Sequence, residues 1–291
     1  MYTISTILAG VLWGCISLFL KPLTSAGFSS LQVMVFRAVL SSIMLLVYLA
    51  LVNPELLKIQ FRDIWMFIGT GVISLTFFSI CYFKTILEIG TSVAVILLYT
   101  SPIFVLLLSV LLFKEKINLV KIIALIMTFA GSILVAGVIG AGEPQITAKG
   151  FVIGLCAGFG YALYSIFSRF ALKKYHSLTV TFYTFVFSGI SLLPFAQLSS
   201  ITCFGDVKTV FLVVGIALFC SVLPYIFYTF GLSGLENGRA AILVTVEPLV
   251  GTLVGFFIWG EPVNVANVTG IILIFAAVIL LGLAPSKKRD C

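Results

Sequence analysis

The chain has 291 residues, of which 61% are hydrophobic and only 9% are charged. Soluble domains are typically about 45–50% apolar and about 25% charged, so this composition excludes a soluble globular protein. The formal net charge is +7. The positions of the basic residues, described below, indicate orientation in a membrane and attraction to anionic lipid rather than binding to nucleic acid.

Ten apolar segments are long enough to cross a bilayer, since a hydrocarbon core of about 30 Å needs roughly 20 helical residues. Their hydrophobicity is continuous rather than alternating, which favours helices over a β-barrel. We therefore predict an all-α integral membrane protein with ten transmembrane helices and no soluble domain between them. The predicted spans are residues 3–20, 31–52, 64–84, 91–113, 118–139, 150–170, 177–198, 209–230, 238–259 and 264–284.

The basic residues are distributed unequally between the two faces that these spans define. If the amino terminus is cytoplasmic, that face carries twelve Lys and Arg and the other carries four, with Arg37 left inside a span. Cytoplasmic loops are typically the basic ones. We therefore predict a multi-pass protein of the cell (plasma) membrane with both termini in the cytoplasm.

The amino terminus lacks the basic region of a cleaved signal peptide, so the first span is predicted to remain in the mature protein. The six cysteines show no metal-binding or redox spacing, and Cys203 and Cys291 are predicted to lie on opposite faces. We expect no disulfide, no metal site and no cofactor. Motifs for phosphate binding, zinc hydrolysis or a nucleophile are also absent from the sequence, so an enzyme is not predicted.

The sequence repeats itself after 146 residues without a gap, and the matched residues include types that are uncommon in apolar spans. Each copy contains five spans, an odd number, so the second copy must begin on the opposite face and the repeats are inverted. We predict repeats at residues 1–140 and 147–291 that form one membrane domain. The matched pairs are Gly14 and Gly160, Gly69 and Gly215, Tyr82 and Tyr228, Pro102 and Pro248, Glu115 and Glu261, and Asn118 and Asn264.

Glu247 is the acidic residue that falls near the middle of a predicted span. An acid at that depth costs about 2.5–3.5 kcal/mol on insertion scales, which suggests a function in binding substrate or a proton. The structural alternatives are a protonated carboxyl bonded to a neighbouring helix and a salt bridge that fixes packing. The proline that follows, Pro248, and its counterpart Pro102 are expected to break their helices and to leave the carbonyls of Val244 and Leu98 free. We predict that both breaks line the transport pathway.

Aromatic residues could form a wall around an amphiphilic or cationic solute at the same depth. Trp13 is central in the first span, whereas Trp259 lies near a span end, where an interfacial aromatic belt is expected. Ordinary packing is the alternative for each member of this wall. The other candidate members are Tyr82, Tyr99, Tyr161 and Tyr228.

Three further charged residues have open roles. Arg37 lies within its span, where it is expected to extend outward, to pair internally or to bind substrate. Lys84 and Glu88 are spaced four residues apart at a helix end, which favours an interfacial ion pair over contact with substrate.

The segments "YTSPIFVLLLSVLLFKEKI" at 99–117 and "VTVEPLVGTLVGFFIWGEPV" at 244–263 each place a Glu thirteen residues after a Pro. In this pattern the whole chain resembles the ten-helix EamA family of the drug/metabolite transporter superfamily. The resemblance implies a central cavity lined by the first, third, fourth, sixth, eighth and ninth helices. It supports Glu247 and the five aromatic residues as substrate-binding residues, weakens Arg37, and suggests an architectural role for Glu115 and Glu261.

We therefore predict a secondary transporter that exports amino acids or related amphiphilic solutes by alternating access, with protons as candidate coupling ions. Uptake of a cationic, choline-like nutrient is the alternative, and a lipid-modifying enzyme or a non-transporting scaffold is the alternative of another class. The expected partners are a small-molecule substrate and membrane lipid, without nucleic acid. Substrate, direction, coupling ion, and the choice between monomer and homodimer stay open.

Overall fold

The computed structural model describes residues 1–136, 146–195 and 206–284. Within these ranges it contains helices and no strand. Nine helical segments in the described residues are long and apolar enough to cross a membrane, and Leu119–Val135 is a shorter apolar helix. This agrees with the predicted ten-helix membrane fold. Cys203 and Cys291 lie outside the described residues, so their expected positions remain untested.

The first five spans contain several interruptions. The first is divided between α1 (Tyr2–Gly14) and α2 (Ser17–Ser25), whereas α3 (Ser30–Val52) is continuous. Short 3-10 turns η1 (Pro54–Leu57) and η2 (Phe61–Asp63) lead into the third span, which comprises α4 (Ile64–Ile68), η3 (Gly69–Thr76) and α5 (Phe77–Ile89). The fourth is divided into α6 (Thr91–Leu98) and α7 (Ser101–Phe113), and the fifth is α8 (Leu119–Val135).

The last five spans repeat this order. The sixth is α9 (Ala148–Ala171), and the seventh is α10 (Ser177–Leu192) with the 3-10 turn η4 (Leu193–Phe195). The eighth comprises α11 (Val207–Ala217), η6 (Leu218–Val222) and α12 (Leu223–Gly234). The ninth is divided into α13 (Asn237–Leu243) and α14 (Val246–Trp259), and α15 (Val265–Leu283) is the tenth.

Both repeats contain a π-helical segment at the corresponding place, η3 in the third span and η6 in the eighth. A π-turn disturbs the regular helical ladder and is often found at functional positions. Here each segment contacts the other repeat: the Arg37 guanidinium donates to the Cys220 carbonyl at η6 over 2.7 Å, and Ser74 of η3 donates to the Gly160 carbonyl over 2.8 Å. The π-segments therefore help to join the two repeats.

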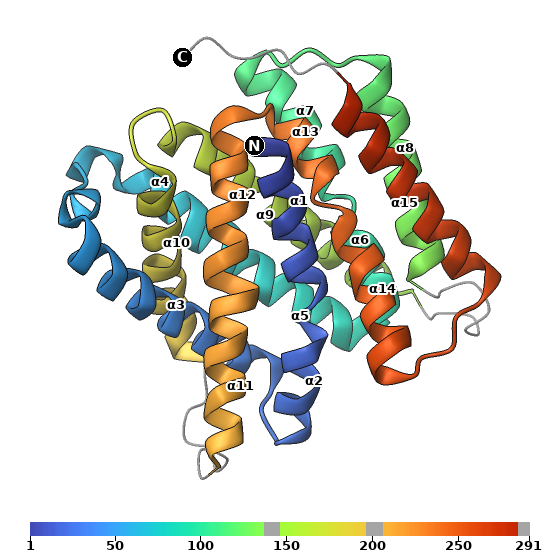
Figure 1. The fold of residues 1–291 in the computed structure, drawn as a ribbon, viewed down its shortest axis with the longest axis horizontal. Coiled ribbons are helices and arrows are strands. Elements are labelled where there is room, and N and C mark those ends of the chain that lie inside the picture. Colours follow the sequence, from blue (N-terminus) through green and yellow to red (C-terminus); the bar gives the residue numbers. More distant parts are fainter. Residues whose placement is uncertain (137–145, 196–205, 285–291) are drawn as a thin grey trace.

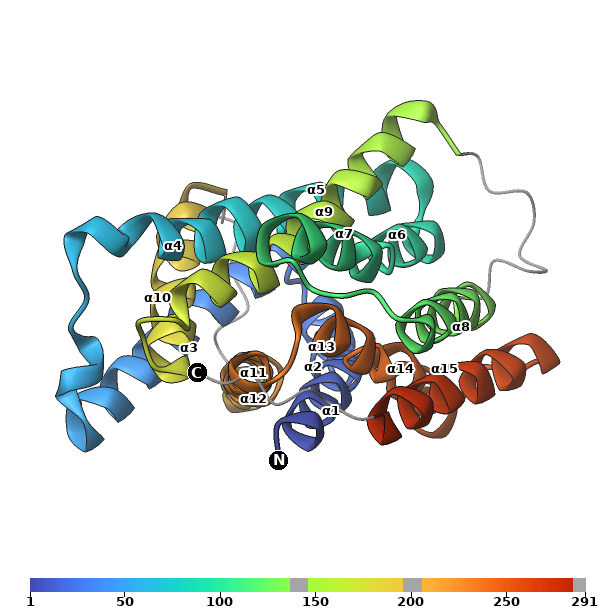
Figure 2. The same cartoon turned by 90° about the horizontal axis from the view of Figure 1, so that it is seen from above.

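Helices from different repeats pack together throughout the bundle. α1 lies against α12 and α14, α5 lies against α9, and α3 lies against α10. α8 and α15 pair at one edge of the molecule (Figures 1 and 2). Their close approach requires glycine, because a Cβ at Gly131 would lie 2.8 Å from the Gly270 carbonyl oxygen. The repeats consequently form one interleaved bundle.

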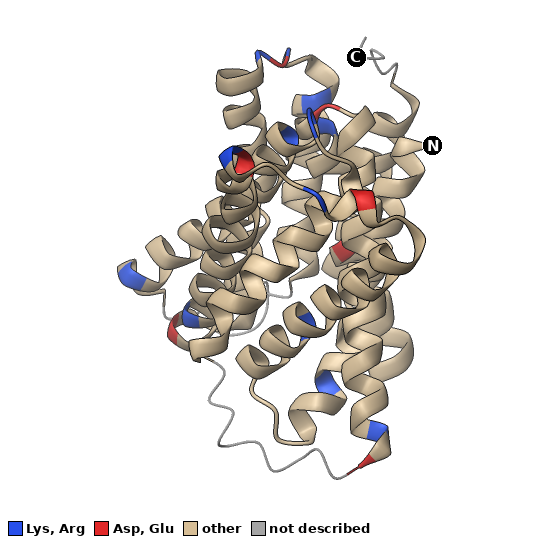
Figure 3. Ribbon diagram, turned by 90° about the vertical axis from the view of Figure 1, so that its left-hand side faces the viewer, with Lys and Arg blue, Asp and Glu red and all other residues tan. Residues whose placement is uncertain are grey.

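Charged residues are sparse along the bundle, and Figure 3 shows more Lys and Arg toward the end that carries the N-terminus than toward the opposite end. Two arginines at that end bind carbonyl oxygens at the carboxyl ends of helices. Arg169 donates to Leu235 over 3.0 Å and also to Leu232, and Arg239 donates to Ala284 over 2.9 Å. Such contacts satisfy groups that a helix end leaves unpaired, and they tie the helices together at this end.

Candidate functional site

A cavity of about 730 Å³ lies between the two repeats. Its lining extends from Glu247 in the middle of the ninth span to Glu261 and Asn264 in the loop after it. That loop joins α14 to α15 at the end of the bundle opposite the N-terminus (Figure 1). The cavity therefore opens toward the end away from the N-terminus.

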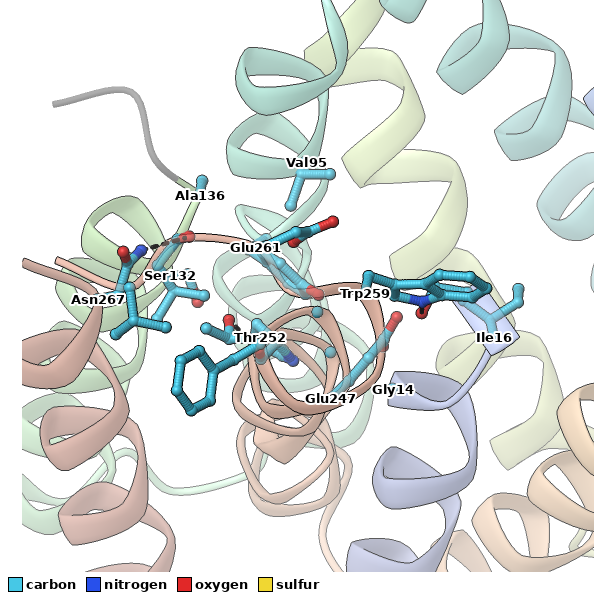
Figure 4. A pocket seen from close by; sticks show the side chains of 18 of the residues that line it. Gly14, Ile16, Val95, Ser132, Ala136, Glu247, Thr252, Trp259, Glu261 and Asn267 are labelled. Atoms are coloured by element: carbon cyan, nitrogen blue, oxygen red, sulfur yellow. Dashed lines mark hydrogen bonds between the residues drawn. The ribbon is translucent and has the colours of Figure 1, made fainter. Parts of the chain in front are cut away.

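The first, third, fourth, fifth, ninth and tenth spans supply the lining. The resemblance implied the sixth and eighth spans instead of the fifth and tenth. Figure 4 shows Glu247, Thr252 and Trp259 on α14, with Ser132 and Asn267 on the facing helices. The lining residues include Trp13, Gly14, Ser17, Tyr82, Val95, Tyr99, Ser132, Glu247, Pro248, Gly251, Thr252, Phe256, Trp259, Glu261, Asn264 and Asn267.

Glu247 lies in the first turn of α14, directly after the break in the ninth span. The helix is interrupted at Val244 and Thr245, before Pro248 as the sequence suggests. The Val244 carbonyl is not free, however, because it accepts the Glu247 backbone N–H over 3.1 Å. A tighter turn has taken up the acceptor that proline released. The expectation of a free carbonyl at this position was therefore wrong.

Two glycines bring α1 against this break. A Cβ at Gly10 would lie 2.6 Å from the Val244 carbonyl oxygen, and a Cβ at Gly14 would lie 2.7 Å from the Glu247 carbonyl oxygen. Larger residues would push the first and ninth spans apart. The glycines thus determine how closely Trp13, on the same helix, approaches the Glu247 segment.

The Glu247 side chain is partly buried and faces the cavity. Within the described ranges its carboxylate has no hydrogen bond and no ion pair. Neither structural alternative, a bond to a neighbouring helix or a fixed salt bridge, is therefore seen in this conformation. A carboxylate at the membrane midplane without a protein partner is available to a bound ligand or a proton.

The predicted aromatic wall is divided between two spaces. Trp13, Tyr82 and Tyr99 line the same cavity as Glu247. Tyr161 and Tyr228 instead line a separate space of about 10 Å³ behind Trp13, with ring centroids 6.4 Å and 5.6 Å from that of Trp13. Trp13 is 7% exposed and lines both spaces, so it forms the partition between them.

Two tyrosines that sequence analysis did not single out complete the cluster behind Trp13. Tyr225 lies 5.1 Å from the Trp13 ring and 5.1 Å from the Tyr164 ring. The Tyr164 hydroxyl is 2.6 Å from the Thr229 hydroxyl, and the Tyr228 hydroxyl is 2.8 Å from the Ser165 hydroxyl. These rings pack together behind Trp13. No sequence signal distinguishes them from the other aromatic residues of apolar spans.

The remaining predicted residues lie outside the cavity lining. Pro102 is buried beside the break in the fourth span, and Arg37 is 8% exposed. The Arg37 Nε donates to the Ser221 hydroxyl over 2.8 Å, in addition to its bond at Cys220. Arg37 therefore occupies a position in the interface between the repeats.

One expectation about a surface ion pair needs correction, and Trp259 makes contacts that were not expected. Glu88 forms its ion pair with Lys149 of the next repeat rather than with Lys84, because folding brings α9 beside the end of α5. Trp259 lies at the cavity mouth, where its indole N–H donates to the Ser17 hydroxyl over 3.3 Å and its ring lies 5.0 Å from the Lys21 ammonium. It therefore connects the first and ninth spans in addition to any interfacial role.

Three polar residues of the cavity lining were not singled out from the sequence. Ser132, Thr252 and Asn267 line the cavity. The Asn267 amide donates to the Val135 carbonyl over 3.3 Å, and Thr252 donates to the Pro248 carbonyl over 2.9 Å. The repeat after 146 residues, which matches Asn118 with Asn264, drew attention to the start of the tenth span but did not single out these side chains.

The charge of the lining has one sign. Among the described residues, Glu247 and Glu261 are the charged side chains that line the cavity. Glu261 is neutralised by Lys21, whose ammonium lies 2.5 Å from its carboxylate at the mouth. The deeper part of the cavity therefore carries a negative group surrounded by aromatic rings, an arrangement that attracts cations.

Known proteins resemble this chain over three quarters of its length or more. A protein of Archaeoglobus fulgidus named "Uncharacterized transporter" is 27% identical over 275 residues, which cover 94% of this chain and 93% of that protein. The Bacillus subtilis "Uncharacterized transporter YxxF" is 24% identical over 222 residues, covering 75% of this chain and 70% of that one. A chain in a solved crystal structure has the same fold, with a TM-score of 0.82, 15% identity and coverage of 97% and 96%.

The sequence model of the EamA-like transporter family matches residues 1–137 and again residues 148–283. These two matches correspond to the two five-span halves that enclose the cavity. The chain therefore belongs to the EamA-like transporter family and is a multi-pass membrane transporter.

Proposed function

We propose that this protein is a secondary transporter that carries a small amphiphilic solute by alternating access, and that the cavity around Glu247 is its substrate site. The observation that carries the proposal is the partnerless carboxylate at the inner end of an open cavity. Inverted repeats support it, because two near-equivalent packings allow a central site to open to either end. This conformation would be the state open away from the N-terminus.

The lining favours solutes that carry an ammonium group beside an apolar part. A buried carboxylate is costly unless a cation or a proton neutralises it. Glu247 would therefore hold either the substrate ammonium or a proton, and the exchange of one for the other would couple proton movement to transport. Trp13, Tyr82 and Tyr99 would contact the apolar part and the face of the cation.

Export of amino acids or their derivatives is the leading proposal for direction and substrate. Uptake of a choline-like cation is a second candidate, which is favoured by the absence of Lys and Arg from the described lining beside Glu247. A free carboxylate on the substrate would find hydroxyl and amide donors there but no cationic side chain. Amines, amides and esters of amino acids keep the ammonium group for Glu247 and lack the free carboxylate, so they fit both the amino-acid proposal and a lining without a cationic side chain.

Purified protein in proteoliposomes would test the proposal. Flux of labelled amines, amino acids and choline under imposed pH gradients of both signs would give substrate class, direction and coupling. We expect Glu247→Gln to abolish coupled flux and Glu88→Gln, the same change at an exposed ion pair, to preserve it. Coupled flux with an unchanged pH profile in Glu247→Gln would contradict the role of Glu247.

The location in the plasma membrane and the cytoplasmic position of both termini belong to the same proposal. The greater number of basic residues toward the N-terminal end supports this orientation. Protease accessibility of a tag at each terminus in intact cells would test it.

A further inference from the structure

Two equivalent glutamates, Glu115 and Glu261, have the same local backbone at opposite ends of the bundle. The residue before each is left-handed, with φ of 54° at Lys114 and 65° at Gly260. Each glutamate N–H donates to the carbonyl six residues earlier, over 3.2 Å and 3.1 Å respectively. The asparagine three residues after each one caps the next helix over 2.9 Å. What differs between the two ends is therefore the partner of the carboxylate.

Glu115 closes the end that carries the N-terminus. Its side chain is buried, with 5% exposure of the residue, and its two carboxylate oxygens accept the backbone N–H groups of Asn237 and Gly238 over 2.9 Å and 3.3 Å. These groups begin α13, on the other repeat, and are also buried. An ion pair between Lys121 and Glu236 at 2.5 Å lies beside them. The carboxylate thus joins the fourth and ninth spans through the unpaired donors of a helix start.

Glu261 occupies the corresponding position at the open end, but it does not make the corresponding contact. Its side chain is 54% exposed and pairs with Lys21. The residues that match Asn237 and Gly238 after the shift of 146 are Thr91 and Ser92, at the start of α6. Both are exposed, and within the described residues their backbone N–H groups have no hydrogen-bond partner. The donors that Glu261 would require are therefore present and unused.

We propose that Glu261 is a gating residue with two binding places. In the conformation described here it binds Lys21 and the cavity is open. In the opposite conformation its carboxylate leaves Lys21 and accepts the N–H groups of Thr91 and Ser92, which closes the cavity mouth. Glu115 then releases Asn237 and Gly238 at the other end. This inference rests on the alternating access proposed above, and it adds the pair of contacts that would alternate.

The two partners of Glu261 should have unequal strength. An ion pair between two half-exposed side chains contributes little, because water screens it and both chains lose freedom. A carboxylate buried against two backbone N–H groups makes stronger, charge-assisted hydrogen bonds, and the proposal requires these bonds to exceed the cost of burying the charge. Removing Lys21 would therefore favour closure of the mouth, whereas removing the Glu261 carboxylate would favour the open state. If Glu261 and Lys21 only formed a static salt bridge, removing either side chain would shift the balance between the open and closed states in the same direction.

Gly251 offers a probe position for this test. It lines the cavity, and the nearest atom to an added Cβ is the Gly14 carbonyl oxygen at 3.7 Å, an ordinary contact. Gly251→Cys would be labelled with a membrane-impermeant maleimide in right-side-out and in inverted vesicles. Labelling of the native cysteines, measured without the probe substitution, would be subtracted. No substrate is needed, so the position of the gate is read separately from transport.

We expect Lys21→Ala to lower labelling from the open end by about 1.5- to 5-fold and to raise it from the N-terminal end. Glu261→Ala and the more conservative Glu261→Gln should have the opposite effect: labelling from the open end should rise, and labelling from the N-terminal end should fall. Glu115→Ala should increase labelling from the N-terminal end, because it loosens the closed side.

Two results would overturn the inference in distinguishable ways. In the first, Lys21→Ala and Glu261→Ala change labelling in the same direction, or not at all, while Glu115→Ala exposes the probe from the N-terminal end. The gating role of Glu261 would then be wrong, and alternating access would stand. If none of these variants permits labelling from the N-terminal end, alternating access itself fails and the inference fails with it.

Discussion

The breaks in the fourth and ninth spans share a backbone plan but have different chemistry. α6 ends at Leu98 and α7 begins at Ser101, and α13 ends at Leu243 and α14 begins at Val246. The residue that matches Glu247 in the first repeat is Ser101, which is 3% exposed and outside the cavity lining. The repeat therefore builds the helix break twice, whereas among the described residues the break with a charged side chain in the cavity lining is that of the ninth span.

The strongest test of this difference is to exchange the two residues. We expect Glu247→Ser with Ser101→Glu to abolish transport and to lower the free energy of unfolding by about 2.5–3.5 kcal/mol, because the acid would lie in a closed site without a partner. Flux in proteoliposomes and thermal unfolding in detergent would measure both effects. Transport by the exchanged protein would show that either break can serve as the site.

The second test concerns the close contact that only the ninth-span break makes with α1. Gly14→Ala places a Cβ against the Glu247 carbonyl and Val250, and overpacking of this kind costs about 1–3 kcal/mol. We expect a lower unfolding temperature and reduced transport. Gly251→Ala is the matched control for stability, since its Cβ has room, and it should unfold at the same temperature as the unchanged protein. Equal stability of the two variants would contradict the close packing.

A smaller effect should distinguish the cavity wall from the cluster behind it. Trp13→Leu removes an aromatic face from the cavity that Glu247 lines, and loss of a cation–π contact worth about 0.5–2 kcal/mol weakens cation binding about 2- to 30-fold. Tyr225→Phe keeps its ring and should leave binding unchanged. Thermal-shift titration with the substrate identified by flux would compare them. Equal losses in both variants would mean that the substrate reaches the inner cluster.

The smallest expected effect is the pH dependence of the closed end. Burial raises the pKa of Glu115, although the N–H groups of Asn237 and Gly238 and the ammonium of Lys121 oppose this, and Glu236 adds to it. A raised pKa means that the folded state binds its proton more tightly than the unfolded state. The stabilisation is therefore complete below the ordinary pKa of 4.5 and is lost as pH rises through the raised value.

Thermal unfolding between about pH 4 and pH 8 would measure this contribution, which should appear as a loss of stability as the pH rises through the raised pKa of Glu115. Glu115→Gln should remove it, and Glu55→Gln, at an exposed ion pair with Lys58, should not. A variant whose stability keeps the original dependence on pH would assign the effect to another group.

The sequence by itself determined the features that depend on lipid as a solvent. Continuous apolar runs must be helices, because backbone groups in hydrocarbon have to be paired within the segment. Ten such runs, their repetition after 146 residues and the breaks before Pro102 and Pro248 could therefore be predicted. Glu247 could be singled out for the same reason, since a charge in hydrocarbon is costly wherever its helix is placed.

Tertiary structure decided which side of each helix meets the cavity. These spans are apolar around their whole circumference, so no periodic pattern in the sequence fixes their rotation. Packing between the repeats turns Tyr82 and Tyr99 toward Glu247 and places Tyr161 and Tyr228 behind Trp13. It also gives Glu115 and Glu261 different partners in equivalent local structures, because only one end of the bundle is closed.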